Sequence, residues 1–574
     1  MARWLRGAVG VVAVALGAVV VSRPTTSLGV LALLLGAGLV VSAVVELMSD
    51  EPARWRVTRA LVWLGAGVLI LVSRGLTVRV VAVVVGVGLI VGGVLRALGG
   101  LRRGVTVDAR VAALMLGVAE VVFGVLALAW PDITLLVVAV VFGARLIIAG
   151  AVASWQAVRG TETPASTNPP RAWRRWTRTI VAVVVLALAI GAAGVSAALH
   201  RASPVVDDFY AAPRDVPDEP GRLIRAEPFT RDVPPGALAW RILYTTTRGD
   251  GRAEVASGIV VVPEGDGPWP VLDWAHGTTG FAQNCAPSLA PRPFESGAMF
   301  VLDQVVDEGW ALVAPDYIGL GAQAPHPYLV GLDSAHAVLD AARAARDLPE
   351  ARLGDRHVVW GHSQGGGVAL WTAAEAGTYA PELDLAGVAA LAPAANLPGL
   401  VGDLPQVSGG SVFAAFVAAA YTATYDDVRY RDYVRPGAEG IFRQMATRCL
   451  TEPGVLVSIL SALALERDPD VFSADPTTGA FGRRLAQNVP PATGTAPLLL
   501  AQGGSDGLVT AESQDEYVDG LCAAGRQVDY RVYAGLDHVA LVEPGSPLVP
   551  DLIAWTADRF SGSPPPTGCA RSGG

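Results

Sequence analysis

The sequence predicts an all-α membrane domain, made of three helical hairpins and a seventh spanning helix, followed by a water-soluble α/β domain. Long apolar runs fill the first 200 residues, whereas short apolar strands alternate with helices after about residue 240. The charge changes with them: residues 1–200 hold 18 Arg against 7 Asp or Glu, and the later residues hold 25 Arg against 45. With 52% hydrophobic and 17% charged residues, the chain is neither one soluble globule nor disordered.

Seven apolar runs reach or approach the ~20 residues that cross a bilayer as a helix. They lie at about 8–22, 28–48, 57–73, 76–98, 109–130, 132–157 and 179–199. The segments that start at Ser22, Ser73 and Ala129 align with one another at offsets of 51 and 56 residues, which indicates a repeated helical hairpin. Because the unit of the first run recurs and no clear A-x-A site follows it, we interpret that run as a membrane span rather than a cleaved signal peptide.

The three hairpins resemble the six-helix membrane domain of the acid-resistance (HdeD-like) protein family. We therefore predict a membrane domain over residues 1–158. A cytoplasmic linker over 159–178, which contains TETPASTNPP, is expected to lead into a seventh transmembrane helix over 179–200.

Arginine counts predict the orientation of these spans. Alternate connecting segments carry 14 Arg, whereas the intervening turns carry only three. The positive-inside rule places the Arg-rich segments in the cytoplasm, so we expect a cytoplasmic N-terminus and an extracytoplasmic domain after His200. Glu120 and Arg145, inside the fifth and sixth runs, could form an ion or proton site. We favour a structural ion pair, because a transport route needs more polar groups.

After residue 240 the pattern favours a mostly parallel sheet covered by helices on both faces. WRILYTTTRGDGRAEVASGIVVVPEG is expected to form two strands around a turn at Asp250-Gly251. Six further strands are predicted at PVLDWAHG, WALVAPDY, HVVWGHS, LAGVAALAP, APLLLAQG and VDYRVYAG, with helices such as SAHAVLDAARAARDL and GGVALWTAAEAG between them. Such a sheet carries its chemistry at the carboxyl ends of its strands.

The segment Gly361-His362-Ser363-Gln364-Gly365 is a G-x-S-x-G motif between a predicted strand and a predicted helix. In such a strained turn, the residues two before and two after the serine must lack side chains, and the hydroxyl projects from the sheet. The amide of the following residue is then free to bind an oxyanion. We predict Ser363 as the nucleophile and the Gln364 amide as one oxyanion donor.

A second match to the same pattern surrounds Ser505, which is a competing nucleophile. If Ser505 were the nucleophile, little chain would remain for a sheet, an acid and a base. With Ser363 as the nucleophile, Asp506 follows the seventh strand and His538 the eighth, which is the order of the acid and the base in α/β-hydrolases. Asp537 is a weaker candidate for the acid, because neighbouring residues on an extended segment point apart.

A second oxyanion donor is expected from the loop HGTTG after the third strand of this fold. We select the Thr278 amide and hold Thr279 in reserve. His276 is interpreted as shaping that loop, and Asp316 as forming a turn, rather than as catalytic residues. No spacing of His, Cys and carboxylates indicates a metal site, and we predict no metal and no cofactor. The acidic soluble part predicts no nucleic-acid partner.

Five segments, HGTTGFAQNCAPS, PDYIGLG, GHSQGG, GGSDGLV and GLDHVAL, together resemble the secretory lipase family of α/β-hydrolases over about residues 205–570. The resemblance implies an α/β-hydrolase domain at 205–574 with a helical cap at about 395–490. It also implies hydrolysis of triacylglycerols or other acyl esters. Typical members are secreted, so the predicted membrane anchor is a departure from the family.

All four cysteines follow residue 200. Four cysteines allow three pairings, and an extracytoplasmic location favours disulfides over free thiols. The family resemblance favours Cys285–Cys449 and Cys522–Cys569.

We therefore expect a membrane-anchored, extracytoplasmic serine esterase or lipase that works through an acyl-enzyme. Its expected partners are an acyl ester or lipid substrate and the membrane itself. Three alternatives remain open: an acyltransferase with the same triad, a serine peptidase of the same fold, and a membrane sensor or scaffold with an inert hydrolase domain. An intact Ser363, Asp506 and His538 set argues against the inert domain.

Overall fold

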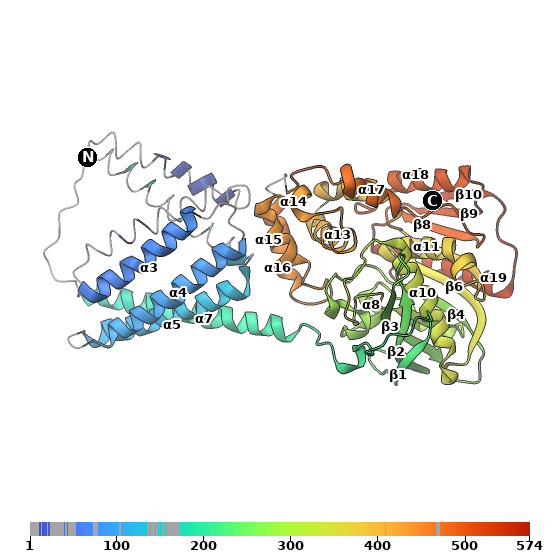
Figure 1. Cartoon of the computed structure of the whole chain (residues 1–574), viewed down its shortest axis with the longest axis horizontal. Helices are drawn as coiled ribbons and strands as arrows, with labels where there is room; N and C mark the ends of the chain where they lie inside the picture. Colours follow the sequence, from blue (N-terminus) through green and yellow to red (C-terminus); the bar gives the residue numbers. More distant parts are fainter. Residues whose placement is uncertain are drawn as a thin grey trace. The chain divides into compact units, whose positions relative to one another are not determined.

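The computed structural model describes residues 53–72, 78–102, 105–131, 172–407, 409–466 and 471–573, with scattered positions within 11–43 and 133–158. The chain divides into two compact units (Figure 1). The first unit comprises Met1–Ala202, Val434–Gln444 and Leu456–Ser473, and the second comprises Ser203–Tyr433, Met445–Val455 and Ala474–Gly574.

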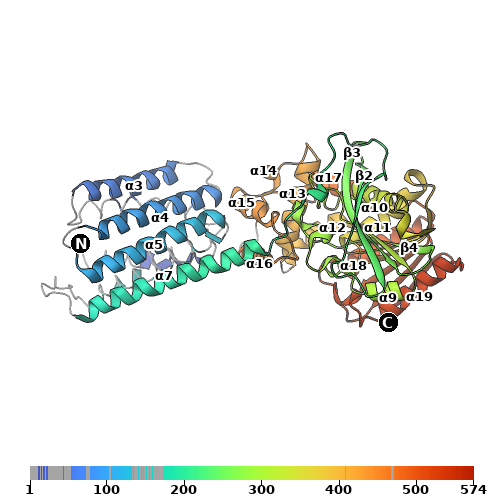
Figure 2. The same ribbon diagram turned by 90° about the horizontal axis from the view of Figure 1, so that it is seen from below.

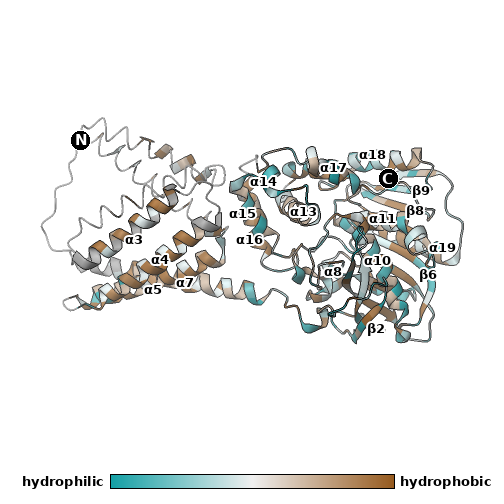
Figure 3. Cartoon of the chain, in the orientation of Figure 1, coloured by the Kyte–Doolittle hydropathy of each residue, from teal (hydrophilic) through white to brown (hydrophobic). Residues whose placement is uncertain are grey.

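The N-terminal part contains four long helices in its described residues. They are α3 (Ala53–Val72), α4 (Val78–Gly100), α5 (Val107–Ala129) and α7 (Ala172–Arg201). Apolar residues predominate along them (Figure 3), and three segments are long and apolar enough to cross a membrane: Ala82–Gly100, Val107–Ala129 and Thr179–Arg201. Only scattered positions of the first, second and sixth predicted spans are described.

Helix α7 begins at Ala172, within the predicted linker over 159–178. The last residues of that linker are therefore helical. No Gly or Pro occurs between Pro170 and the apolar run, so nothing in the segment AWRRWTRT stops the helix from extending toward its N-terminus.

Glycines seven residues apart bring α4 and α5 into close contact. A Cβ atom added to Gly93 would lie 2.5 Å from the carbonyl oxygen of Gly117, and one added to Gly124 would lie 2.6 Å from that of Gly86. Small residues allow helix backbones to approach closely in membranes, where no hydrophobic effect drives the helices together. These four glycines therefore fix the register of the hairpin.

We expect Gly93→Ala to destabilise this hairpin by roughly 1–3 kcal/mol, because the added methyl group meets backbone that cannot move aside easily. Gly65→Ala is the matched control, since a Cβ at Gly65 in α3 has nothing within 4 Å. Unfolding of the full chain by titration with a denaturing detergent measures both variants. Equal stability of the two variants would show that the glycine contact does not hold the hairpin.

Glu120 on α5 pairs with Arg96 on α4. The Arg96 Nε atom lies 3.0 Å from Glu120 Oε2, and a second guanidinium nitrogen lies 2.8 Å from Oε1. The structure thus gives Glu120 a partner on the neighbouring helix, and the expected pair with Arg145 falls outside the described residues.

A ten-stranded mixed sheet forms the framework of the second unit, in the order β1-β2-β3-β5-β4-β6-β7-β8-β9-β10. The pairs β1–β2, β2–β3 and β3–β5 are antiparallel, and the remaining pairs are parallel. The strands are β1 (Leu223–Pro228), β2 (Ala237–Thr247), β3 (Ala253–Pro263), β4 (Trp269–Ala275), β5 (Ala311–Pro315), β6 (Leu353–His362), β7 (Asp384–Leu391), β8 (Leu498–Gly503), β9 (Val528–Tyr533) and β10 (Cys569–Gly573). All eight predicted strands are present, and the two edge strands β1 and β10 are additional.

Helices cover both faces of the sheet, because successive residues of a buried strand point to opposite sides. In β6, Val359 packs with Ala369 of α11 (Gln364–Tyr379). The next residue, Trp360, packs with Trp555 of α19 (Leu548–Ser561) on the other face. The other helices around the sheet are α8 (Pro293–Ser296), α9 (Leu302–Asp307), α10 (Gly331–Arg346) and α18 (Ala511–Ala523).

Six helices lie between β7 and β8 in the chain, within the predicted cap segment. They are α12 (Leu397–Asp403), α13 (Gly410–Thr424), α14 (Tyr430–Tyr433), α15 (Pro436–Met445), α16 (Val455–Glu466) and α17 (Gly479–Gln487). Figure 2 shows helices α10 and α11 beside the central strands, as the α/β-hydrolase fold requires. Short 3-10 turns complete the unit: η1 (Asp208–Tyr210), η2 (Gln283–Cys285), η3 (Pro287–Leu289), η4 (Pro349–Ala351), η5 (Leu404–Gln406) and η6 (Ala540–Val542).

Candidate active site

A strained turn joins strand β6 to helix α11 and carries Ser363 at φ 58° and ψ −119°. Glycines on both sides make this turn possible. A Cβ on Gly361 would lie 2.1 Å from the carbonyl oxygen of Gly365, and a Cβ on Gly365 would lie 1.9 Å from that of Ala275. Backbone strain of this kind persists only where the surrounding structure enforces it, and such strain clusters at active sites. The turn therefore has the geometry of a nucleophile elbow.

Three side chains from separate parts of the chain meet at this turn. The Nε2 atom of His538 lies 2.8 Å from Ser363 Oγ, and its Nδ1 atom lies 2.7 Å from Asp506 Oδ2. Asp506 comes from the loop after β8, and His538 from the loop after β9. Since a carboxylate accepts, Nδ1 carries the proton, and Nε2 is left to accept a proton from the serine hydroxyl.

The loop after β8 also keeps Asp506 ionised. Its Oδ1 atom accepts hydrogen bonds from the backbone amides of Leu508 and Val509, both at 2.9 Å. Burial acts to raise the pKa of Asp506, but the hydrogen bond from His538 and those from the two amides outweigh burial, so the pKa is lowered. A carboxylate with a lowered pKa can stabilise an imidazolium that forms on His538.

The structure places the two competing residues elsewhere. Ser505 is exposed, and its backbone amide donates to the carbonyl oxygen of Leu536. Asp537 is also exposed, and its Oδ1 atom accepts hydrogen bonds from the amides of Val539 and Ala540 at 3.1 and 2.8 Å. Asp537 therefore organises the turn after His538.

His362, the residue before Ser363, contacts His538 directly. Its Nε2 atom lies 2.9 Å from the carbonyl oxygen of His538, so Nε2 must donate. Burial, together with the proximity of the His538 ring, lowers the pKa of His362 to about 3, which keeps this imidazole neutral. A role for His362 in holding the base was not apparent from the motif, because that position of G-x-S-x-G is variable.

The two threonines considered for the oxyanion hole lie in the loop that leaves β4. Strand β4 ends at Ala275, which is in register with Gly361 on β6, so this loop starts beside the elbow. Thr278 is half-buried and Thr279 is buried. The carbonyl of Thr279 accepts a hydrogen bond of 2.8 Å from the amide of Leu450. The loop that carries Thr278 and Thr279 and the turn that carries Gln364 therefore leave neighbouring strands, β4 and β6.

Two side chains from the segment after β5 contact the side chains of the predicted oxyanion residues, and each of them contacts one. The Tyr328 hydroxyl lies 3.0 Å from Thr278 Oγ1, and His326 Nε2 lies 3.4 Å from the side-chain nitrogen of Gln364. The Nδ1 atom of His326 lies 2.9 Å from the carbonyl oxygen of Ile318, so Nδ1 donates and Nε2 accepts from Gln364. Burial lowers the pKa of His326 to about 3, so it stays neutral. Sequence reasoning missed both residues, because no motif spacing connects them to the elbow.

We expect Tyr328→Phe to lower kcat for ester hydrolysis about 10-fold with little change in KM, because the loop that carries Thr278 loses its anchor while the ring keeps its packing. Tyr244→Phe is the matched control. Its buried hydroxyl donates to the carbonyl oxygen of Ala337 at 2.8 Å, away from the elbow. Steady-state kinetics on both variants check this prediction, and an equal fall in kcat for both would contradict it.

Asp316, which follows β5, connects strand β3 to the segment after β4. Its Oδ2 atom accepts hydrogen bonds of 2.6 Å from the hydroxyls of Ser257 and Ser288, and its Oδ1 atom accepts from the Ser288 amide at 2.9 Å. Burial raises the pKa of Asp316 to about 6. His276 is also buried, and burial lowers its pKa to about 4. Among the described residues, neither side chain forms a hydrogen bond or an ion pair with Ser363 or His538, so both hold the framework of the site.

Two disulfides tie this region together. Cys285, in the segment after β4, is joined to Cys449, in the segment after α15. Cys522, near the end of α18, is joined to Cys569 at the start of β10. The first bond therefore links the loop of the predicted oxyanion donors to the cap segment, and the second fastens the C-terminal edge strand.

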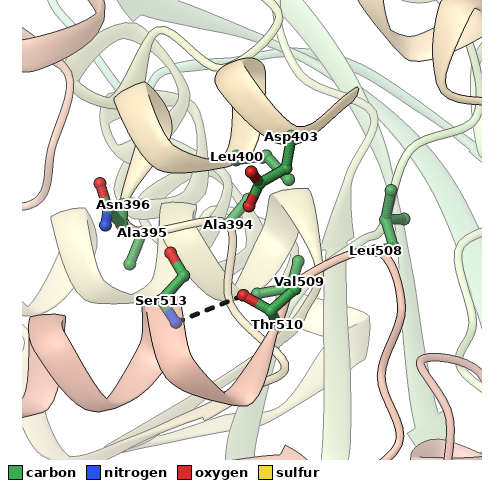
Figure 4. Close-up of a pocket in the computed structure, with 9 residues that line it drawn as sticks. All are labelled: Ala394, Ala395, Asn396, Leu400, Asp403, Leu508, Val509, Thr510 and Ser513. Atoms are coloured by element: carbon green, nitrogen blue, oxygen red, sulfur yellow. Dashed lines mark hydrogen bonds between the residues drawn. The ribbon is translucent and has the colours of Figure 1, made fainter. Parts of the chain in front are cut away.

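A small hollow lies between the start of α12 and the loop after β8 (Figure 4). Its lining includes Leu508 and Val509, whose amides bind Asp506, but neither Ser363 nor His538. This hollow therefore lies beside the acid loop. Within the described part of the chain, no group of three or more His, Cys, Asp or Glu side chains could hold a metal ion.

Comparison with protein families agrees with this geometry. Residues 296–568 match the family model described as secretory lipase. The C-terminal domain matches the secretory lipase family. Residues 8–64, 58–126 and 115–193 each match a family described as a short repeat of unknown function, which agrees with the three N-terminal repeats.

Relatives of the secretory-lipase domain include both lipases and a protein described as inactive. A secreted triacylglycerol lipase of Malassezia globosa is 26% identical, over 64% of this chain and 83% of the relative. Lipase A of Arthroderma benhamiae is 24% identical, over 64% and 82%. A protein of Mycobacterium tuberculosis described as a probable inactive lipase is 27% identical, over 63% and 83%.

Solved structures show the same fold. The crystal structure of Candida antarctica lipase A matches with a TM-score of 0.54 at 18% identity, over 64% of this chain and 89% of that chain. Its closed state matches with a TM-score of 0.52 at 20% identity. The second unit therefore shares the α/β-hydrolase fold of these structures.

Proposed function

We propose that this protein is a membrane-anchored serine esterase or lipase that hydrolyses acyl-lipid esters outside the cytoplasm. One observation carries the proposal: Ser363, on a strained turn, His538 and Asp506 form a continuous hydrogen-bonded relay with contacts of 2.8 and 2.7 Å. This arrangement is the triad that activates a serine for attack on an acyl carbon. The names of the fungal relatives support acyl glycerols as the substrate class.

The proposed reaction has two steps. His538 takes the proton of Ser363 as the hydroxyl attacks the ester carbonyl, and the resulting imidazolium returns the proton to the departing alcohol. Water, deprotonated by His538, then attacks the acyl-enzyme and releases the acid. The amides of Gln364 and of Thr278, with Thr279 in reserve, are the proposed donors to the oxyanion, and one such donor contributes about 3–4 kcal/mol.

The proposed location follows from the arginine distribution and the apolar helices. Thr179–Arg201 is long and apolar enough to cross a bilayer, and the segment before it is rich in arginine. In this orientation, the chain leaves the membrane on its extracytoplasmic side after Arg201. The two disulfides fit an oxidising compartment. We propose a membrane domain over 1–158, a linker before the last span, and a catalytic domain over 205–574 with its cap at about 395–490.

Hydrolysis of p-nitrophenyl esters of increasing acyl length by the full chain in detergent tests this proposal. Turnover that depends on acyl length and releases the free acid supports a lipase or esterase. A product formed only when an acceptor alcohol is added would instead identify an acyltransferase, and cleavage of matched anilides would identify a peptidase. Absence of turnover on every ester would support the inert scaffold.

A further inference from the structure

Helix α16 carries apolar residues on its exposed side as well as on its buried side, which is unusual for the surface of a water-soluble domain. Leu456, Ile459, Leu460 and Leu463 are between 43% and 58% exposed, and their spacing places them on one helical face. The side chains of Ser458 and Ser461 are instead buried, at 1% and 0% exposure. Val457, Ala462 and Leu465 are buried as well, so α16 is apolar on its inner side and also on its outer side, and its outer face is not adapted to water.

The exposed hydrophobic side chains of this part of the chain are concentrated on α16 rather than scattered over the surface. From residue 203 onward, seven large hydrophobic side chains of the described residues are exposed, and four of them are on α16. The other three, Val205, Leu238 and Val539, lie on three different segments. Isolated exposed apolar residues are normal on protein surfaces, whereas a contiguous apolar patch marks an interaction site.

The protein's own sequence indicates what covers this face. A candidate membrane span ends at Arg201, and Leu456–Ser473, which includes nearly all of α16, belongs to the same compact unit as that span, so α16 is part of the unit that the membrane would anchor. At 1.5 Å per residue, the 12 residues of α16 extend about 18 Å, too short to cross about 30 Å of hydrocarbon. No charged residue occurs in Val455–Leu465. A short, apolar, uncharged helical face suits insertion into one leaflet, parallel to the membrane plane.

We propose that α16 docks on the lipid surface of the membrane in which the chain is anchored, with Leu456, Ile459, Leu460 and Leu463 inserted among the acyl chains. The cap would then sit on the leaflet that supplies acyl esters. This proposal deepens the proposed function by naming bilayer lipid as the source of substrate. The docking itself does not depend on the chemistry of Ser363.

Depth-dependent quenching tests this docking. The four native cysteines form two disulfides, so Leu460→Cys and Leu463→Cys each introduce a single thiol for an environment-sensitive fluorophore. The labelled full chain is reconstituted in phosphatidylcholine–phosphatidylglycerol vesicles that carry doxyl-labelled lipids. We expect at least about a two-fold loss of fluorescence at both positions. Leu238→Cys on β2 is the matched control, because Leu238 is similarly exposed, at 47%, but lies on a different element. A fluorophore at this position should be quenched little.

Quenching at 460 and 463 no stronger than at 238 would overturn the proposal. Cross-linking of Leu460→Cys into dimers without quenching would also overturn it, by identifying a second copy as the occupant. The same quenching in Ser363→Ala separates docking from catalysis: it should persist even if no ester is hydrolysed. A paired Leu460→Glu and Leu463→Glu variant should lose most turnover of bilayer-embedded ester but keep that of a short water-soluble ester.

Discussion

Replacement of Ser363 with Ala is expected to lower kcat for ester hydrolysis by roughly 10⁴–10⁶-fold, because removal of the nucleophile leaves only binding and oxyanion stabilisation. The hydroxyl lies 2.8 Å from His538 Nε2, and the variant changes no other contact of the triad. The measurement is kcat with a p-nitrophenyl ester, together with the thermal midpoint to show that the fold is intact.

Ser505→Ala is the control for this variant, because Ser505 occupies the same position in the second G-x-S-x-G pattern but is exposed. Its activity should stay within about two-fold of the wild type, as expected for a surface substitution. If Ser505→Ala abolished turnover while Ser363→Ala retained it, the assignment of the nucleophile would be reversed.

Asp506→Asn is expected to lower kcat about 10⁴-fold with little change in the shape of the site. The carboxylate accepts from His538 Nδ1 at 2.7 Å, and an amide nitrogen at that position would donate and favour the wrong tautomer of His538. The pKa of Asp506 is lowered from 3.8, so its ionised form adds stability above that pH, which is lost as the pH falls. The variant should therefore lose part of the stability gain that the wild type shows on going from acid to neutral pH.

Asp537→Asn tests whether Asp537, the neighbour of His538 in the chain, acts as the acid in place of Asp506. The side chain of Asp537 accepts hydrogen bonds from the amides of Val539 and Ala540, and the amide oxygen of Asn can still accept from them. We expect less than about a five-fold change in kcat, since the relay to Ser363 is unaffected. A loss comparable to that of Asp506→Asn would mean that the acid has been misassigned. Steady-state kinetics and pH-dependent thermal unfolding of both variants give the answer.

The sequence predicted the parts of the fold that depend on local pattern. The eight strands with apolar runs were recognisable because both faces of the central sheet are buried. The edge strands β1, LIRAEP, and β10, CARSG, were not recognisable, because an edge strand is partly solvent-exposed and carries no continuous apolar run. Similarly, helix α7 extends before its apolar part, where hydropathy gives no signal.

At the site, sequence reasoning located the residues that a motif constrains and missed those that only packing brings together. The glycines around Ser363 are required by the steric limits of the turn, so they leave a pattern in the chain. His326 and Tyr328 contact Gln364 and Thr278 through side chains from a different segment, and no local rule connects them. The contact of Glu120 with Arg96 was missed for the same reason, since only the packing of α4 on α5 brings the two side chains together.

Covalent labelling by a fluorophosphonate tests the central claim most directly, since the reagent reacts with a serine only where a base and an oxyanion hole activate it. The full chain is labelled in detergent, digested and analysed by mass spectrometry for the modified peptide. We predict a single phosphonyl group on Ser363 that is lost in His538→Ala. Modification of Ser505 instead, or no modification of a folded wild-type chain, would contradict the proposed serine hydrolase.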